Sequence, residues 1–441
     1  MVNLCRHPKP GAFGSTGAVC ALVLSALVST PLHAQDPGMA QEPAPADTRF
    51  DASARVDAYH APRDDRAAAD SSVLTGQFKA STDWSDTVRT VFDARLSTTR
   101  RDGQSSGARN DSQLLEAYGS KQSGETEWRL GRQVLAWGRA DGINPTDNLT
   151  PRDLVTWLPF EDDQRFGVWA LRGNTRLSDT YDLTVVVSPW FQGSVIPLPV
   201  LPHAVTTASP DYKLANTTFA IKLNRSADAF DWSVSYLRGL SLLPEGRVLY
   251  ADAMGPGIEF HYDRVQVLGA DMARNVGRFG LRAEAAMTWT HGSDDGRPAQ
   301  RTPDLFVVAG VDHTVSGNLN VNLQAIGRHV MRFNDPYAIA EPGQRQMAIQ
   351  NAITVGQQDS TTWGYSLRVS DKWLEETLQG EVLLVDFRTR DTRALKPMLS
   401  YAVTDRIKTT LGAVIYCGAD DTLFGRKKHS NRIYLELRYA P

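Results

Sequence analysis

Apolar and polar residues alternate along most of this chain, in segments of about ten residues that are separated by polar turns. The clearest segment is 279–290, where apolar side chains occupy the odd positions from Phe279 to Trp289, whereas Arg282, Glu284 and Thr288 occupy even positions. Similar alternation recurs in the segments 50–59, 89–96, 231–236, 319–328, 363–370 and 433–439. A period of two residues gives a strand one apolar and one polar face. The pattern therefore predicts an all-β protein.

Two features favour a transmembrane barrel over a soluble β-sandwich, whose strands would also alternate. The polar face carries repeated charges, such as Arg282 with Glu284 and Glu436 with Arg438, which a dry protein core would not tolerate. Tryptophans also lie near predicted strand ends, as in the aromatic girdles at the two membrane interfaces. They are Trp84, Trp128, Trp137, Trp169, Trp190, Trp363 and Trp373. We therefore expect lipid outside the barrel and water inside it.

The connections between the predicted strands alternate between short and long, as in bacterial outer-membrane barrels. The short ones are 82–86, 122–125, 177–181, 225–228, 275–278, 316–318 and 404–405. The long ones are 62–73, 101–111, 141–164, 193–212, 241–262, 291–303, 334–360 and 418–431, and 388–391 is a brief exception on the long side. With both termini in the periplasm, the strand number must be even. We predict a transmembrane antiparallel up-and-down β-barrel of 18 strands with short periplasmic turns and long extracellular loops, or of 16 strands if the first two segments are not both in the wall.

The chain begins with the layout of a secretory signal peptide, which we assign to residues 1–34. A basic start precedes the apolar run 18–28, and small residues lead up to Ala34. The apolar run is too short to cross a bilayer as a helix. Residues 35–49 are rich in Pro, Ala, Asp and Glu, so they are expected to form a disordered periplasmic linker. The barrel is then expected to occupy residues 50–441.

Composition narrows the classes of function. An apolar fraction of 41% with a negative mean hydropathy excludes a bundle of membrane helices. The 47 Lys and Arg residues and the 50 Asp and Glu residues give a formal net charge of −3, so nothing indicates a nucleic-acid partner. The expected partners are outer-membrane lipid and lipopolysaccharide, a small-molecule solute, and the barrel-assembly machinery. The expected location is the cell outer membrane of a Gram-negative bacterium.

The segment that follows Trp128 is the most informative part of the chain. Residues 128–134 alternate as a strand, and the dipeptides Asp141-Gly142, Asn144-Pro145 and Thr150-Pro151 then mark turns. A new strand begins only after Glu161-Asp-Asp163. A loop of this length inside an ordered protein is usually functional.

This segment also carries a resemblance to a known family. The motifs Gly131-Arg-Gln-Val134, Trp137-Gly138, Asn144-Pro-Thr-Asp147 and Val168-Trp-Ala-Leu-Arg172 resemble an uncharacterised, porin-like family of proteobacterial outer-membrane β-barrels that is similar in layout to the alginate-export porins. Segments 267–271, 280–286, 319–324, 412–416 and 421–425 fit the same family. The resemblance covers most of residues 70–441. It implies a barrel in the outer membrane and, through the alginate exporters, an export port.

Charged residues of the lumen-facing parity are the main candidates for a substrate path. The planar fork of an arginine binds oxyanions in pairs, so an arginine on a pore wall attracts and orients carboxylates or phosphates. The candidates are Arg89, Arg95, Arg129, Arg172, Arg282, Glu284, Arg328, Arg368 and Arg438. Alternatively, the arginines pair with lumen acids such as Asp93, Asp271, Glu284 and Glu436 and brace the barrel. The pairs Arg282/Glu284 and Glu436/Arg438 look structural in this sense.

Three loop segments add further hypotheses. Asp147, Arg152 and Asp153 are candidates for a constriction, although Asp and Asn side chains also cap their own turns. Residues 344–355 lack alternation and have apolar residues at near-helical spacing, which predicts a short helix inside a long extracellular loop. The apolar, proline-rich run 195–202 is expected to fold into the mouth of the lumen, because exposed apolar loops are unusual.

The function that these observations favour is an outer-membrane channel or porin, which passes a small anionic or amphipathic solute through a charged lumen. A first alternative is an export port for a polysaccharide or lipid. A second is an outer-membrane lipid hydrolase, because His291-Gly-Ser293 matches the His-x-Ser pair of outer-membrane phospholipases. No Walker loop, dinucleotide fingerprint or zinc-spacing cluster accompanies it. We therefore predict no catalytic residue, no metal and no cofactor.

Overall fold

The computed structural model describes residues 47–61, 70–101, 108–155, 164–196, 205–207, 210, 213–227, 230–251, 255–290 and 300–441. The predicted signal peptide, most of the predicted linker, the run 197–202 and the pair His291/Ser293 lie outside the described residues. The first strand begins at Asp47, three residues before the predicted start of the barrel at Phe50.

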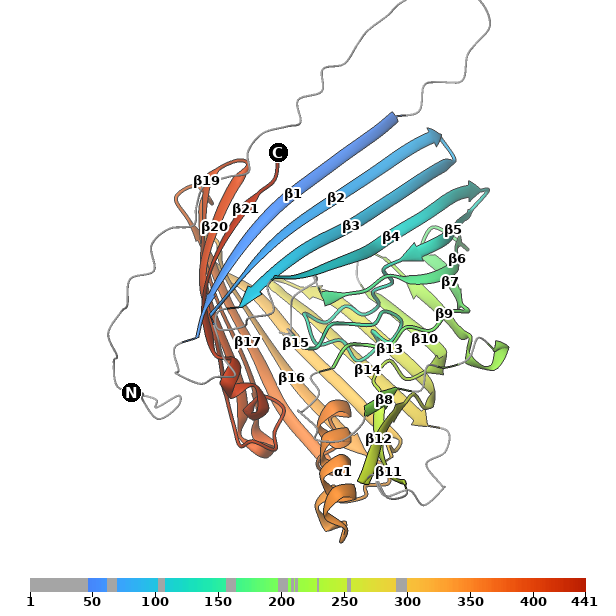
Figure 1. The fold of residues 1–441 in the computed structure, drawn as a ribbon. Coiled ribbons are helices and arrows are strands. Elements are labelled where there is room, and N and C mark those ends of the chain that lie inside the picture. Colours follow the sequence, from blue (N-terminus) through green and yellow to red (C-terminus); the bar gives the residue numbers. More distant parts are fainter. Residues whose placement is uncertain are drawn as a thin grey trace, which may run out of the picture. The chain divides into compact units, whose positions relative to one another are not determined.

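The described residues form a closed barrel of 18 antiparallel strands, which confirms the predicted fold and strand number. The strands are β1 (Asp47–His60), β2 (Ser71–Ser85), β3 (Val88–Arg101), β4 (Arg109–Ser123), β5 (Thr126–Gln133), β6 (Val168–Arg176), β7 (Tyr181–Ser188), β9 (Thr218–Arg225), β10 (Asp231–Leu240), β13 (Arg264–Val276), β14 (Phe279–Thr290), β15 (Asp304–Ser316), β16 (Leu319–Val330), β17 (Thr361–Trp373), β18 (Leu378–Phe387), β19 (Thr392–Thr404), β20 (Ile407–Cys417) and β21 (Arg432–Tyr439). Strand β1 pairs with both β2 and β21, and this pairing closes the ring (Figure 1). Closure leaves no exposed sheet edge.

The strands are joined by tight turns at one rim of the barrel and by longer segments at the other. Gly277 (φ 59°) and Gly317 (φ 53°) occupy two of the tight turns in the left-handed region, which glycine adopts without steric cost. The predicted exception among the long connections is the single 3-10 turn η4 (Arg388–Arg390). We call the two ends of the barrel the short-turn rim and the long-loop rim.

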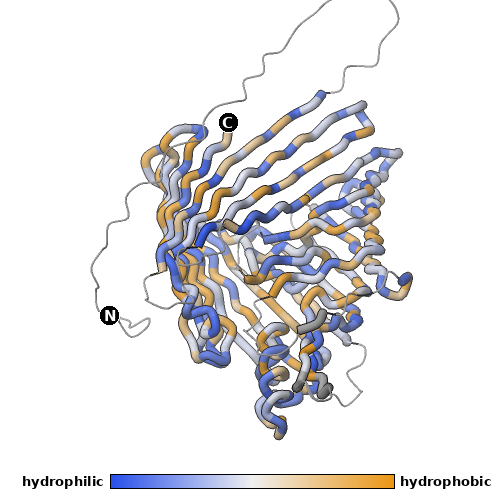
Figure 2. The backbone as a smooth tube through the Cα atoms, in the orientation of Figure 1, coloured by the Kyte–Doolittle hydropathy of each residue, from blue (hydrophilic) through white to orange (hydrophobic). Residues whose placement is uncertain are grey.

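The outer face of the barrel is apolar. Phe50 and Leu130 are both 67% exposed, and apolar and polar residues alternate along each strand in Figure 2. Exposed tryptophans form two belts, as expected of aromatic girdles. Trp84, Trp128 and Trp373 lie at the short-turn rim, and Trp169, Trp190, Trp289 and Trp363 lie at the long-loop rim.

The tryptophan prediction was wrong for Trp137. Its side chain packs partly buried inside the barrel, against the cluster that contains Leu135, Leu149 and Val186, and Lys222 lies 5.7 Å from its ring centroid. Sequence position suggested a strand end, but β5 already ends at Gln133. The chain then turns inward instead of staying at the lipid interface.

A helix and a small sheet lie at the long-loop rim (Figure 1). The helix α1 (Pro342–Val355) confirms the predicted helix and begins two residues earlier, where the Glu341 carboxylate caps the backbone N–H of Gly343 at 3.0 Å. The sheet consists of β8 (Val205–Thr207), β11 (Glu245–Ala251) and β12 (Gly255–His261). Asn351 of α1 bonds both the N–H and the C=O of Gly246 in β11 at 2.8 Å, so the helix and the sheet form one unit.

Three further 3-10 turns complete the described elements: η2 (Leu214–Asn216), η3 (Pro336–Ala338) and η5 (Gly425–Ser430). None of the described helices is long and apolar enough to cross a membrane.

Candidate functional site

The connection between β5 and β6 enters the barrel. We call its described part, residues 134–155 and 164–167, the inserted loop. Its first anchor is Glu284 of β14, whose side chain is almost completely buried. The Glu284 carboxylate accepts the backbone N–H groups of Arg139 and Ala140, and it accepts the Thr146 hydroxyl at 3.1 Å. Charge-assisted bonds of this kind are among the strongest in proteins, so Glu284 fixes the loop backbone against the wall.

Glycine is required at position 138 by this anchor. Gly138 has a φ of 103°, which side-chain-bearing residues rarely adopt, and a Cβ atom there would lie 2.6 Å from Glu284 Oε1. The absence of a side chain is therefore what lets the loop backbone reach the carboxylate.

Arg139 forms a second anchor, on the neighbouring strands. Its Nε lies 2.6 Å from Asp271 of β13, and its Nη1 lies 3.5 Å from Asp231 of β10. Lys222 of β9 shares Asp271 at 3.4 Å. Asp271 is buried and Arg139 is only slightly exposed, so this network is screened less by solvent than a surface ion pair.

The third anchor lies on β16 and β17, opposite to β5, from which the loop starts. Asp141 pairs with Arg368 of β17 at 2.8 Å, and Gln324 of β16 donates to the Asp141 carbonyl at 3.1 Å. From β5, the ring runs through β6, β7, β9, β10, β13, β14, β15 and β16 to β17, which is half of the 18-strand circuit. The inserted loop therefore crosses the lumen from one wall to the other.

The predicted constriction residues lie inside this loop. The Asp147 side chain is fully buried and pairs with Arg152 at 2.5 Å and with Arg165. Asp153 accepts the N–H of Val155 at 2.9 Å and forms a bridge with Val195. Asp147 and Arg152 thus hold the two halves of the loop together, and Arg139 and Asp141 make the contacts to the wall.

The predicted lumen arginines fall into two groups on opposite walls. Arg89, Arg129 and Arg172 lie on one line across β3 to β6, because Ser120 of β4 pairs in register with both Arg89 and Arg129, and Arg129 pairs with Arg172. Arg129 is bonded to Glu127 at 2.9 Å, and Arg89 lies 3.5 Å from Asp83. This line forms an arginine row near the short-turn rim.

On the other wall, Arg282 pairs with Asp312 of β15 at 3.6 Å. The expected pair of Arg282 with Glu284 is not formed, because the inserted loop occupies the Glu284 carboxylate. Arg368 holds Asp141, as described above.

The remaining candidates lie apart from these groups. Arg328 pairs with Asp304 at 2.5 Å and lies over the Phe306 ring, Arg95 stands in register with Gln77 and Gln113, and Arg438 stands in register with Arg55 and Lys408. The structure therefore does not gather the predicted residues into one site.

A large cavity lies between the inserted loop and the elements of the long-loop rim. Its volume is about 890 Å³. Its apolar lining includes Ile143, Ile258, Phe306, Ile326, Met347 and Leu423. Its cationic lining consists of Arg328, Arg390, Arg426 and Lys427, and Asp359 and Asp420 are the acids among the described lining residues.

Lys427 and Arg426 belong to η5, outside the barrel strands. Burial lowers the pKa of Lys427 to about 8, and its Nζ donates to the Leu154 carbonyl at 3.0 Å. Burial also lowers the pKa of Arg426. Both shifts mean that the two cations are short of hydration, so an anion that entered the cavity would be stabilised beside them.

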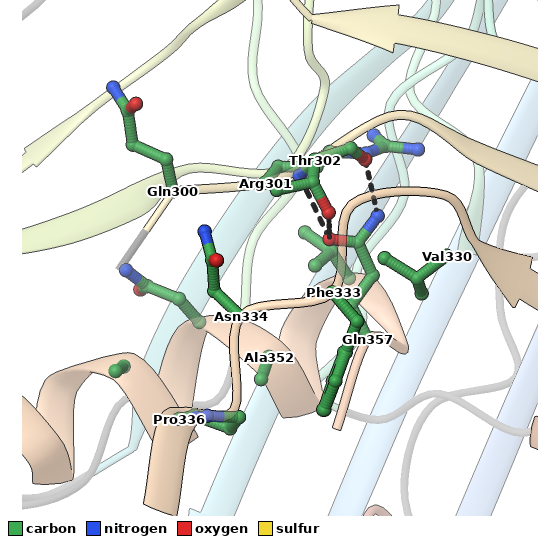
Figure 3. Close-up of a pocket in the computed structure, with 12 residues that line it drawn as sticks. Gln300, Arg301, Thr302, Val330, Phe333, Asn334, Pro336, Ala352 and Gln357 are labelled. Atoms are coloured by element: carbon green, nitrogen blue, oxygen red, sulfur yellow. Dashed lines mark hydrogen bonds between the residues drawn. The ribbon is translucent and has the colours of Figure 1, made fainter. Parts of the chain in front are cut away.

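A second, much smaller pocket is shown in Figure 3. Its volume of about 20 Å³ has room for little more than one water. Gln357 closes it: its amide donates to the Thr302 carbonyl at 2.7 Å and accepts the Thr302 N–H at 3.0 Å (Figure 3). We interpret these hydrogen bonds as the contact that attaches the segment after α1 to the barrel wall.

Comparison with known proteins gives the family. The model of the family described as "Protein of unknown function (DUF1302)" matches residues 25–422. The chain belongs to this DUF1302 family. No curated protein matches its sequence.

Several solved structures share the fold of this DUF1302 barrel. OpdK of Pseudomonas aeruginosa, solved with vanillate, is 10% identical with a TM-score of 0.54 over 90% of this chain and 98% of that chain. OccAB1 of Acinetobacter baumannii is 10% identical with a TM-score of 0.53 over 90% and 96%. OccD3 of Pseudomonas aeruginosa is 11% identical with a TM-score of 0.50 over 89% and 91%. At these identities the likeness shows the fold, which is that of outer-membrane porins.

Sequence reasoning missed the residues of this DUF1302 chain that make the contacts to the wall and the cavity. Arg139 was not singled out, although it is a lone charge between two turn-forming pairs, Trp137-Gly138 and Asp141-Gly142. The basic run Arg426-Lys-Lys428 was visible but was not weighed. No pattern in the sequence indicated that these two segments approach the same interior.

Proposed function

We propose that this DUF1302 barrel is a passive channel of the Gram-negative outer membrane for a small anionic or amphipathic solute. The observation that carries the proposal is the inserted loop, which leaves β5, crosses the inside of a closed barrel and is held at the opposite wall by Arg139 with Asp271 and by Asp141 with Arg368. An 18-stranded barrel is too wide for side chains alone to fill. A loop fixed across such a lumen would set the size of the solute that passes.

The proposed passage runs between the inserted loop and the wall of β1 to β4. The bonds that anchor the loop come mainly from the opposite wall, on β9 (Asn224, bonded to Arg139), β10, β13, β14, β16 and β17. The inner face of β1 to β4 carries polar groups such as Gln77 and Asp93, which are bonded to each other at 2.9 Å. The arginine row of Arg89, Arg129 and Arg172 faces the part of this passage near the short-turn rim and would favour anions.

The two rims support a placement in the membrane. The apolar outer face with its tryptophan belts suits contact with outer-membrane lipid. We place the short-turn rim and both ends of the barrel in the periplasm, and the long-loop rim outside, against lipopolysaccharide. Export through the signal peptide 1–34 and insertion by the barrel-assembly machinery are parts of the same proposal.

The cavity favours an amphipathic solute over a polysaccharide. Its lining is largely apolar, with residues such as Phe306 and Ile326, and a sugar polymer would need many hydrogen-bonding partners there. We assign no catalytic step to the protein. The motif that suggested a hydrolase, His291 with Ser293, lies outside the described residues.

Reconstitution of the purified full chain into planar bilayers tests the channel. We expect stepwise conductance with a preference for anions, and a smaller anion preference for Arg129→Gln. Arg176→Gln is the matched control, because Arg176 lies 4.0 Å from Glu125 and both side chains are exposed. A folded protein that gives no conductance steps would overturn the proposal.

A further inference from the structure

The cavity at the long-loop rim combines an apolar body with a cationic edge. Its apolar surface comes from parts of the chain that are far apart in sequence: Ile143 on the inserted loop, Phe306 and Ile326 on the wall, and Met347 on α1. Its volume of about 890 Å³ lies within the range of pockets that bury most of a small organic ligand. A ligand that fills this space must therefore present a large apolar surface.

The cationic side chains that line the cavity differ in whether an acidic side chain pairs with them. Arg328 pairs with Asp304 at 2.5 Å, and Arg390 pairs with Asp359 at 2.7 Å. The Arg426 guanidinium makes no ion pair with a residue of the described ranges, and only the more distant Tyr337 and Asp421 attract it. Its neighbour Lys427 is buried against the Leu154 carbonyl. Positive charge is thus concentrated at η5.

Leu423, immediately before this segment, lines the same cavity. One loop therefore presents an apolar side chain and two cations to the same space, and its acid Asp420, which also lines the cavity, is paired with Lys428. Lys427 supplies a point charge, and Arg426 supplies a planar fork that matches the two oxygens of a carboxylate.

We propose that this cavity binds a hydrophobic monocarboxylate, with its carboxylate at Arg426 and Lys427 and its apolar body against Leu423, Phe306 and Ile326. The proposal rests on the proposed channel function, because the cavity would be the binding site for the solute at the extracellular end of the channel. A cation would be repelled by η5. A neutral analogue would fill the apolar space but would offer Arg426 and Lys427 no negative charge.

Calorimetric titration of the full chain in lipid nanodiscs tests this site, with empty nanodiscs as the correction for partitioning into lipid. The probes are 2-naphthoate, its neutral amide 2-naphthamide, and 2-naphthylmethylammonium. We expect naphthoate to bind at least about tenfold more tightly than the amide, and the ammonium probe to bind most weakly.

Variants separate the two parts of the site. Arg426→Gln should weaken naphthoate binding by about tenfold and leave the amide within about twofold. Leu423→Gln should weaken both probes alike, because it removes apolar contact only. Arg345→Gln on α1 is the matched control, since Arg345 does not line the cavity and contacts the Ile339 carbonyl; it should bind both probes as the wild type does.

The result that overturns the inference is equal binding of naphthoate and amide by the wild type, or unchanged naphthoate binding by a folded Arg426→Gln variant. Folding is checked by the shift in gel mobility of the heated barrel, and Lys427→Met provides a second test of the cationic edge if Arg426→Gln does not fold. Conductance is measured separately in planar bilayers. If the protein conducts but does not prefer naphthoate over the amide, only the proposed binding site is wrong. If it binds naphthoate selectively but gives no conductance steps, only the proposed channel function is wrong.

Discussion

The same strands line two different interiors, one at mid-barrel and one at the long-loop rim. On β16, Gln324 is bonded to the inserted loop, whereas Ile326 and Arg328, further along the same face, line the apolar cavity. On β18, Glu381 is followed on the inner face by Leu383, Val385 and Phe387. A side chain on the inner face of the barrel is therefore not always in contact with water. What covers a residue inside the barrel decides whether a polar or an apolar side chain is stable there.

The two interiors are also stabilised by different kinds of contact. Around the inserted loop, buried carboxylates such as Glu284 and Asp271 satisfy backbone N–H groups and an arginine. At the long-loop rim, apolar packing dominates, as where Phe424 stacks on Tyr416 with ring centroids 6.0 Å apart. Loss of one buried polar partner leaves donors unsatisfied, whereas loss of one apolar contact leaves a gap that neighbours can partly fill. We therefore expect mid-barrel changes to have the larger effects.

The largest effect is expected for Glu284→Ala. The change frees the N–H groups of Arg139 and Ala140 and the Thr146 hydroxyl, and should cost about 3 kcal/mol of loop stability. The loop should then move away from the wall. Single-channel recordings should show higher and noisier conductance than the wild type.

Asp312→Ala is the matched control for this change. It removes a lumen carboxylate from the adjacent strand β15, where Asp312 pairs with Arg282. Its conductance should stay steady. If both variants conducted like the wild type, the anchoring role of Glu284 would be wrong.

Gly138→Val should have an intermediate effect on the same anchor. A Cβ atom would lie 2.6 Å from the Glu284 carboxylate, at a φ of 103° that valine does not adopt readily, for a cost of about 2 kcal/mol. The expected signs are a lower temperature of heat-induced gel shift and noisy conductance. Gly76→Val is the control, because nothing lies within 4 Å of a Cβ atom there; equal behaviour of the two variants would contradict the close approach at Gly138.

The smallest effect concerns the cavity and pH. The pKa of Lys427 is lowered from 10.5 to about 8, so the side chain is a cation below pH 8 and neutral above it. Naphthoate affinity should therefore fall by about fivefold as the pH rises through 8, because the ligand stays ionised while Lys427 loses its charge. Lys427→Met should abolish this step, and Lys428→Met should retain it, since Lys428 does not line the cavity.

The same shift has a consequence for folding. The unfolded chain binds the Lys427 proton more tightly than the folded chain, so between pH 8 and 10.5 the free energy of unfolding rises with pH. Below pH 8 the cost of burying the cation is fully present. A gel-shift temperature of the wild type that did not rise relative to Lys427→Met over this window would contradict the burial of Lys427.

The sequence by itself determined the barrel. The two-residue alternation, the charged inner parity of segments such as 279–290, and the alternation of short and long connections gave the closed antiparallel wall and its 18 strands. These features are local, because the period of a strand follows from backbone geometry and lipid accepts only apolar side chains. Even α1 was visible, since near-helical spacing is read within a few turns.

Tertiary structure alone decided what occupies the lumen. The loop could be recognised as long, but its crossing depends on Arg139 meeting Asp271 and on Asp141 meeting Arg368, which are more than a hundred residues apart in each pair. Glu284 was a candidate for pairing with Arg282 on its own strand, and instead it holds the loop. The cavity likewise depends on η5, α1 and the inserted loop meeting at one place. Alternation fixes which way a side chain points, whereas its partner is fixed only when the closed ring brings distant segments together.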